Sequence, residues 1–454
     1  MRTAILLLLV AACGRVGFGG DGDDDARPPD DAAGSAAAVR WAVTIGNNVR
    51  FMPLAGSAGA PVIAYAFNGS TTIAGQPLTG TATNVSSAVA RFDAAGALVS
   101  TAVLDASTTC DIRGVTMRGD TALVAGLAFG NGGDGACNVS AARQDPIILS
   151  VDPAGAVSRI ALGTASGANA QAWNVRVLPD DTLLASGIYS MGLAFGATAL
   201  PAAGADPNGY IARLPASQPD ALWAIGMTGG VQVTAGPIAL DGSELCMLGG
   251  YQGAGLTEFG KALPYVGSAD ALVVRLDATG ATRFVRGFGS PGQDSYFNDG
   301  SVAALGGGCI GSIAAPGDVT IDGTPLPASD GAGIVAWFDG AGALAGAYRL
   351  PSTAELAVVG TRVIGAYTVS AAVTIGGTTY TPRGQDIVVV ELSATGPTRL
   401  LDVVGGDGDQ SLIRLAAIGP STIAMTLASA GDFELGTTSF TSAPNDRVLA
   451  VLGI

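Results

Sequence analysis

The chain has 454 residues, of which 48% are hydrophobic and only 13% are Asp, Glu, Lys or Arg. Acidic residues outnumber basic ones by 37 to 22, and a net charge of -15 argues against nucleic acid and other partners held by their phosphates. Histidine is absent, which excludes Ser-His and Cys-His catalysis and every His-ligated metal site. We therefore expect a folded, apolar, glycine-rich protein with no metal and no cofactor.

The first residues are expected to form an export signal. An apolar run over residues 4–10 follows one positive charge and is too short to span a bilayer as a permanent helix. Small residues then precede Cys13, a pattern that resembles the lipobox of bacterial lipoproteins. The resemblance implies a signal peptide over residues 1–12, lipidation of Cys13 and, with Gly14 next, anchoring in the outer membrane of a bacterial cell envelope. An ordinary signal peptide with an incidental cysteine is the alternative.

Residues 13–38 read as a linker. Asp, Gly, Pro and Ala dominate this segment, so it has little to bury and should be a disordered acidic tether. Its aspartates lack the later glutamate and the apolar flanks of a calcium loop, so we expect them to be solvated.

From residue 39 onward, short alternating apolar runs recur between Gly, Asp, Pro and Ser clusters, which predicts an all-β fold. Seven of these runs share an apolar pattern and end between 54 and 63 residues apart. Their last residues are Asp93, Asp152, Pro215, Asp277, Asp339, Ser393 and Gly453. Several continue into a turn such as Asp93-Ala-Ala-Gly96, in which Asp bonds the backbone and Gly tolerates positive φ. We predict that these aspartates are structural.

Each repeat holds further strands. A second motif, such as Ile73-Ala-Gly75-Gln-Pro-Leu78, precedes most of these strands, while repeat two has residues 131–137 in its place. Most repeats also open with a strand, a tight turn and another strand. Four strands in about 60 residues is the design of a propeller blade.

The two ends of the chain predict how a ring of such blades would close. The seventh repeat stops at Ile454, directly after its third strand. The segment 39–46 precedes the first repeat and resembles the fourth strands at 221–226 and 282–288. We therefore predict a seven-bladed β-propeller over residues 39–454, in which the N-terminal strand completes the last blade.

Residues 39–454 resemble bacterial envelope proteins built from seven-bladed β-propeller repeats, with loops such as 288–294 and 404–409 between blades. The resemblance implies an envelope propeller. No WD40, sialidase or calcium-loop signature is present in the sequence, so the better-understood propeller families imply no activity for this chain.

Four cysteines remain after Cys13. We predict a disulfide between Cys110 and Cys137, which fall in connections on the same face of the propeller, in a compartment that permits disulfides. Cys246 and Cys309 fall at matching positions of neighbouring blades. We expect them to be free buried thiols, because adjacent blades are usually too far apart for a disulfide, although a cross-blade bond is the alternative.

The groups available for catalysis are few. Lys261, the only lysine, lies in a Gly-rich repeat segment and is expected at the solvated surface. Paired acids could serve a polysaccharide hydrolase or lyase in the propeller funnel. The acids that the repeat places best are Asp294 and Asp299, near Tyr296, and Asp407 and Asp409. We prefer to interpret them as turn and loop-tip residues.

Binding is the function class that we favour over catalysis. Propeller loops form a variable rim on a rigid scaffold, and the acidic, polar loops here suit an envelope protein or a glycan. The binding-face candidates are Asn131, Asp134 and Tyr296. We expect a monomer that reaches the membrane only through its lipid anchor; a passive surface protein with no discrete site stays open as a third possibility.

Overall fold

A computed structural model gives the fold. It describes residues 38–80, 85–104, 109–129, 136–137, 144–166, 169–202, 206–216, 220–227, 232–253, 257–292, 294, 300–436, 438–443 and 445–454. The predicted signal peptide, Cys13 and the linker as far as residue 37 lie outside these ranges. Within them the protein is all-β apart from one 3-10 turn at Ala328–Asp330, as predicted. The described part of the chain holds no helix long and apolar enough to cross a membrane.

The strands form antiparallel sheets with four strands in a common order. From the innermost strand outwards, they are β2 (Val49–Arg50) and β3 (Leu54–Ser57), β4 (Ala60–Asn68), β7 (Val85–Phe92) and β8 (Leu98–Leu104); β9 (Thr109–Arg118), β10 (Thr121–Phe129), β11 (Asp145–Val151) and β12 (Val157–Leu162); β14 (Ala170–Val177), β15 (Leu183–Tyr189), β18 (Asn208–Leu214) and β19 (Trp223–Gly226); β20 (Gln232–Asp241), β21 (Glu244–Gln252), β24 (Asp270–Leu276) and β25 (Thr282–Phe288); β26 (Ser301–Leu305), β27 (Gly308–Ala314), β30 (Gly333–Phe338) and β31 (Leu344–Leu350); β32 (Glu355–Val359), β33 (Arg362–Val369), β36 (Asp386–Ser393) and β37 (Gly396–Gly405); and β38 (Gln410–Gly419), β39 (Thr422–Ser429), β42 (Asp446–Gly453) and β1 (Ala38–Ile45).

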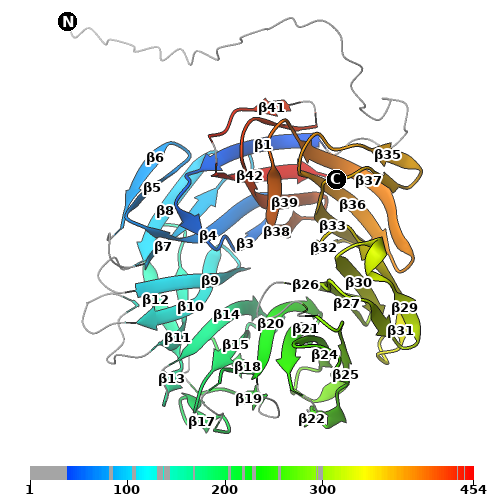
Figure 1. The fold of residues 1–454 in the computed structure, drawn as a ribbon. Helices are drawn as coiled ribbons and strands as arrows, with labels where there is room; N and C mark the ends of the chain where they lie inside the picture. Colours follow the sequence, from blue (N-terminus) through cyan, green and yellow to red (C-terminus); the bar gives the residue numbers. More distant parts are fainter. Residues whose placement is uncertain are drawn as a thin grey trace, which may run out of the picture.

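These sheets follow one another around a common centre, each with its first strand toward it (Figure 1). Radial four-stranded antiparallel sheets are the architecture of a β-propeller. The hydrophobic core lies between neighbouring sheets; Val273 of β24 and Ile313 of β27, for example, are fully buried in one cluster. Strand β1, from the N-terminal end, pairs with β42 from the C-terminal end, with Val43 opposite Leu449.

Short hairpins stand between the second and third strands of most sheets, where the sequence repeats its second motif. They are β5 (Ser70–Ile73) with β6 (Gln76–Thr79), β16 (Leu193–Phe195) with β17 (Thr198–Ala199), β22 (Thr257–Glu258) with β23 (Lys261–Ala262), β28 (Val319–Ile321) with β29 (Thr324–Leu326), β34 (Val373–Ile375) with β35 (Thr378–Tyr380), and β40 (Phe433–Leu435) with β41 (Thr438–Phe440). Turn residues such as Ala74 and Gly75 both have positive φ, 47° and 76°, as a tight hairpin requires. Lys261 is exposed on one of these hairpins, as expected.

Three hairpins also reach the preceding sheet. Strand β40 pairs with β37, and β5 meets β1 at Ile45 and Ile73. Strand β16 pairs with the short strand β13 (Thr164–Ala165), which follows β12. The hairpins therefore join neighbouring sheets by backbone hydrogen bonds as well as by packing.

The recurring aspartates after the third strands are structural, which confirms the prediction. Asp93 Oδ1 accepts hydrogen bonds from the backbone N–H groups of Ala95 and Ala97, both at 2.9 Å. Asp339 does the same with Ala341 and Ala343. The glycine that ends each turn has positive φ, 92° at Gly96 for example.

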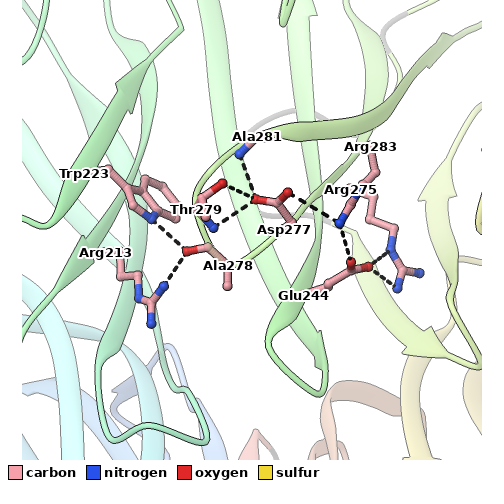
Figure 2. A network of polar contacts seen from close by, with 9 residues as sticks. All are labelled: Arg213, Trp223, Glu244, Arg275, Asp277, Ala278, Thr279, Ala281 and Arg283. Carbon is pink, nitrogen blue, oxygen red and sulfur yellow. Dashed lines mark hydrogen bonds and ion pairs between the residues drawn. The ribbon is translucent and has the colours of Figure 1, made fainter.

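One such turn, at the outer edge of the ring, is the centre of a polar network (Figure 2). Asp277 Oδ1 accepts hydrogen bonds from the N–H groups of Thr279 and Ala281, at 2.9 and 3.0 Å, and from the Thr279 hydroxyl at 2.7 Å. The indole N–H of Trp223, from the neighbouring sheet, donates to the carbonyl of Ala278 at 3.1 Å, and Arg213 donates to the same carbonyl. The turn thus ties two sheets together.

Two disulfides cross-link the fold. Cys110 and Cys137 are bonded, as predicted. Cys246 of β21 and Cys309 of β27 are also bonded, with their Cα atoms 5.7 Å apart, so the expectation of free thiols was wrong. Sheets that radiate from one centre are closest near it, and these second strands come within the Cα separation that a disulfide needs.

Candidate binding site in the central channel

A cavity of about 590 Å³, its opening to solvent included, lies where the innermost strands meet. Every four-stranded sheet contributes to its wall. The lining residues are Pro53, Leu54, Arg113, Gly114, Val115, Asn174, Arg176, Pro237, Ile238, Gly300, Ser301, Val302, Glu355, Leu356, Arg414 and Leu415.

Irregular backbone accompanies this ring of residues. The pairing register of β9 shifts between Ile112 and Gly114, so Arg113 is the extra residue of a β-bulge. Strand β38 shifts its register in the same way just before Arg414. A bulge redirects the side chains around it, which is how charged groups come to line a channel built from apolar strands.

Two of the three channel arginines have carboxylate partners. Arg113 Nη2 lies 3.0 Å from Asp111 Oδ2, and Arg414 Nη1 lies 2.9 Å from Glu355 Oε1. Burial raises the pKa of Glu355, and the neighbouring Arg414 opposes this rise. These charges are locally compensated.

Arg176 is different. Its guanidinium is surrounded by protein while part of it faces the channel, and burial lowers its pKa. Among the described residues, its one hydrogen bond runs from Nη1 to the carbonyl of Val175 at 2.9 Å, and it has no carboxylate partner. Within the described part of the chain, the channel of this acidic protein therefore contains one cation without a counter-charge.

An exposed aromatic side chain stands beside the channel. Phe51 lies two residues before the lining residue Pro53 and leaves 47% of its surface exposed. Its ring centroid is 4.6 Å from Cζ of Arg113. Its φ of 45° is unusual for a residue other than glycine, and such backbone strain is concentrated at functional sites.

Of the predicted catalytic acids, the described residues Asp294, Asp407 and Asp409 do not line this cavity. Asp407 is almost fully exposed, and Asp409 is an exposed residue that accepts a hydrogen bond from the backbone N–H of Gln385 at 3.0 Å. Asp299 and Tyr296, together with the binding-face candidates Asn131 and Asp134, lie outside the described residues.

Asp294 is buried in the loop after β25. Its carboxylate accepts two hydrogen bonds from Ser290, from the backbone N–H and from the hydroxyl, both at 2.6 Å. Asp270 lies close by, since a methyl group at Gly289 would clash with both carboxylates. Burial raises the pKa of Asp294 to about 6, and it also raises that of Asp270. Both carboxylates therefore already accept hydrogen bonds from neighbouring loop residues.

The site residues predicted from the sequence were mainly acids and did not include the channel arginines. Each of them interrupts the apolar first strand of a repeat, as in Ile112-Arg113-Gly114 and Val175-Arg176-Val177. A charge in the middle of a buried strand was the available signal. In the described ranges, no three His, Cys, Asp or Glu side chains are grouped so as to hold a metal ion.

No protein-family model matches this chain, and no curated protein matches it. Similar solved structures include an acylaminoacyl peptidase of Pyrococcus horikoshii, at 8% identity over 88% of this chain and 52% of that chain, with a TM-score of 0.45. The propeller domain of the Trilobed protease from Pyrococcus furiosus is 5% identical over 88% and 96%, with a TM-score of 0.43. A PL25 ulvan lyase is 10% identical over 92% and 96%, with a TM-score of 0.46. The chain spans about half the length of the peptidase, and likenesses this weak imply nothing about activity.

Proposed function

We propose that this protein is a lipid-anchored component of a bacterial cell envelope, in which a propeller over residues 39–454 binds a protein or a glycan. Cys13 would carry the lipid after removal of residues 1–12, and residues 13–38 would be the tether. Two disulfides suit a compartment outside the cytoplasm. The uncompensated Arg176 in the channel is the observation that carries the binding role.

In this proposal the propeller has seven blades and β1 is the fourth strand of the last one. Trp41 of β1 supports this, because it repeats the contact made by Trp223. Its indole N–H donates to the carbonyl of Ala94 at 3.0 Å, and a β-carbon on Gly96 would lie 2.6 Å from its ring. The strand therefore contacts the next sheet as other fourth strands do.

A binding module suits the channel better than a carboxylate enzyme does. Acid catalysis needs two carboxyl groups that reach the substrate. Asp294 is only 3% exposed and Asp270 is fully buried, and both bond backbone N–H groups. The charged groups in the described lining of the channel are arginines and one ion-paired glutamate.

A hydrolase or lyase that uses Asp294 is the second candidate function. Its support is the proximity of Asp270 and a pKa of about 6, which suits a general acid. Incubation with envelope polysaccharides would test it through new reducing ends or unsaturated products. Product formation by the wild type, lost in Asp294→Asn while the fold is kept, would favour this candidate over simple binding.

The binding role is tested with the full chain immobilised against purified envelope polysaccharides and envelope proteins. We expect saturable binding of one fraction, with no chemical change in it. The anchor is tested separately: labelled palmitate should enter the wild type and not Cys13→Ala. Absence of any saturable partner would contradict the binding role, and equal labelling of the two proteins would contradict the anchor.

A further inference from the structure

As far as its residues are described, the channel carries more cationic groups than its carboxylates neutralise. Of the charged side chains that line it, three are arginines and one is a glutamate, which pairs with Arg414. Asp111 pairs with Arg113 from within the same strand. Arg176 alone has no carboxylate among the described residues.

An enclosed cation without a counter-charge is costly, and folded proteins compensate such groups with pairs or bound ions. The guanidinium of Arg176 has five N–H donors, and only one of them makes a hydrogen bond to a described residue. The exposed part of this side chain lines the channel, where a ligand could accept hydrogen bonds from the remaining N–H donors. A carboxylate, phosphate or sulfate has the geometry to accept two of them in parallel.

Phe51 indicates a second property of the ligand, an apolar face that can pack against an aromatic ring. Its exposed aromatic ring, 4.6 Å from Cζ of the lining residue Arg113, offers an apolar surface about the size of a sugar ring beside the channel. Sites of this type combine aromatic contact with a few placed polar groups. A bare anion would use the arginines and leave Phe51 unused, whereas an acidic sugar would use both.

We infer that the central channel binds the anionic group of an acidic sugar, with Arg176 as its principal ligand and Phe51 packed against the ring. This inference rests on the proposed binding role and names the chemical class of the partner. A uronate meets the requirement through its carboxylate, and a phosphorylated or sulfated sugar meets it through its ester. The net charge of the protein, -15, does not oppose such binding at the site itself, because the channel is locally cationic.

The test is calorimetric titration of the full chain with D-glucuronate, D-glucose, inorganic phosphate and a glutamate-rich peptide. We expect glucuronate to bind and glucose, which has the same ring without the carboxylate, to bind at least tenfold more weakly. Arg176→Gln should weaken glucuronate binding roughly 10- to 100-fold, the range of a charge-assisted bidentate contact. Arg176→Lys should restore part of it, and the control Arg50→Gln, exposed in β2, should change nothing.

Phe51→Ala separates the sugar from the anion. We expect a loss of about fivefold for glucuronate and no change for phosphate, because only the sugar contacts the ring. Thermal unfolding shows whether each variant is folded, and Arg176→Gln should unfold at no lower temperature than the wild type. A merely structural arginine would lower that temperature and leave binding unchanged.

Three results would overturn the inference: equal affinity for glucuronate and glucose, undiminished binding by Arg176→Gln, or binding of the acidic peptide without glucuronate. The last would assign the channel to an acidic protein segment. These small probes need no macromolecular partner, so the channel inference can fail while an envelope partner is still found elsewhere on the protein.

Discussion

The outer edge of the ring and its central channel are formed by opposite edges of the same sheets. Their polar groups differ in how many hydrogen bonds they make. At the turn between β24 and β25, Asp277 accepts three hydrogen bonds, and two side chains of the preceding sheet share the carbonyl of Ala278. In the channel, Arg176 donates to one carbonyl and has no described carboxylate partner. The hydrogen bonds at the edge link two sheets, whereas the described contacts of Arg176 leave most of its donors open to the channel.

The largest expected effect at the edge follows from removing Trp223. Its ring lies over Gly280, where a β-carbon would come within 3.0 Å of it, and its N–H donates to Ala278. Trp223→Ala should lower the free energy of unfolding by about 3 kcal/mol. Trp223→Phe keeps the ring contact and should cost only about 1 kcal/mol. Calorimetric unfolding measures both, and equal losses would mean that ring packing contributes little.

Asp402 in β37 is a buried acid at the edge, and replacing it should raise the free energy of unfolding instead of lowering it. It is 7% exposed, and burial raises its pKa to about 7 although the backbone N–H groups of Val403 and Gly436 act to lower it. The folded state therefore keeps its proton while the unfolded state loses it near pH 4, so stability falls as pH rises from 4 to 7.

A shift of this size amounts to about 4 kcal/mol at most. We expect Asp402→Asn to raise the free energy of unfolding at pH 8 by about 2 kcal/mol, because the amide needs no desolvation of a charge. At pH 4 the difference should nearly vanish. Denaturant unfolding at the two pH values measures this, and a pH-independent effect would contradict the assigned pKa.

Asp277→Ala should have a smaller effect, about 1 kcal/mol for the lost turn hydrogen bonds. The hydroxyl of Thr279 lowers the pKa of Asp277 most, with help from backbone N–H groups. Its contribution is therefore present above the ordinary carboxyl pKa and is lost as pH falls through the lowered value. The difference between wild type and variant should shrink when unfolding is followed at progressively lower pH; a constant difference would show that charge plays no part.

The smallest effect is expected for Arg283→Gln. Its side chain is 52% exposed and lies 3.3 Å from Glu244 and 3.5 Å from Asp277. Exposed ion pairs contribute little because solvent screens them, so the change should be below about 0.5 kcal/mol. A loss above about 1 kcal/mol in the same unfolding experiment would mean that the whole edge network acts as one unit.

Local chemistry explains which features the sequence could reveal. The Asp-to-Gly turns depend on residues within four positions of one another, and Asp93 and Gly96 behave as such a pattern predicts. The repeat period likewise predicted four-stranded sheets. Pairing of β1 with β42 also agrees with the likeness between the N-terminal segment and other fourth strands.

The missed features depend on distances between sheets. The bond between Cys246 and Cys309 needs two second strands to lie close together, and nothing within either strand determines that separation. The crossing hairpins and the channel arginines are similar cases: Arg176 and Arg414 lie in different repeats and share a wall only after the sheets are arranged around one centre. The sequence therefore predicted the propeller fold but not most of the residues of the candidate site.

Strand β1 also determines how a mechanical load would enter the molecule. A pull applied to the N-terminal end of β1, at Ala38, would run along this strand. The strand lies antiparallel to β42 over Ala38–Ile45, so its backbone hydrogen bonds would share the load in shear instead of opening one at a time. The indole of Trp41, bonded to the carbonyl of Ala94, would pass part of that load directly to the first sheet. A protein held at this end would thus resist drag with two sheets at once.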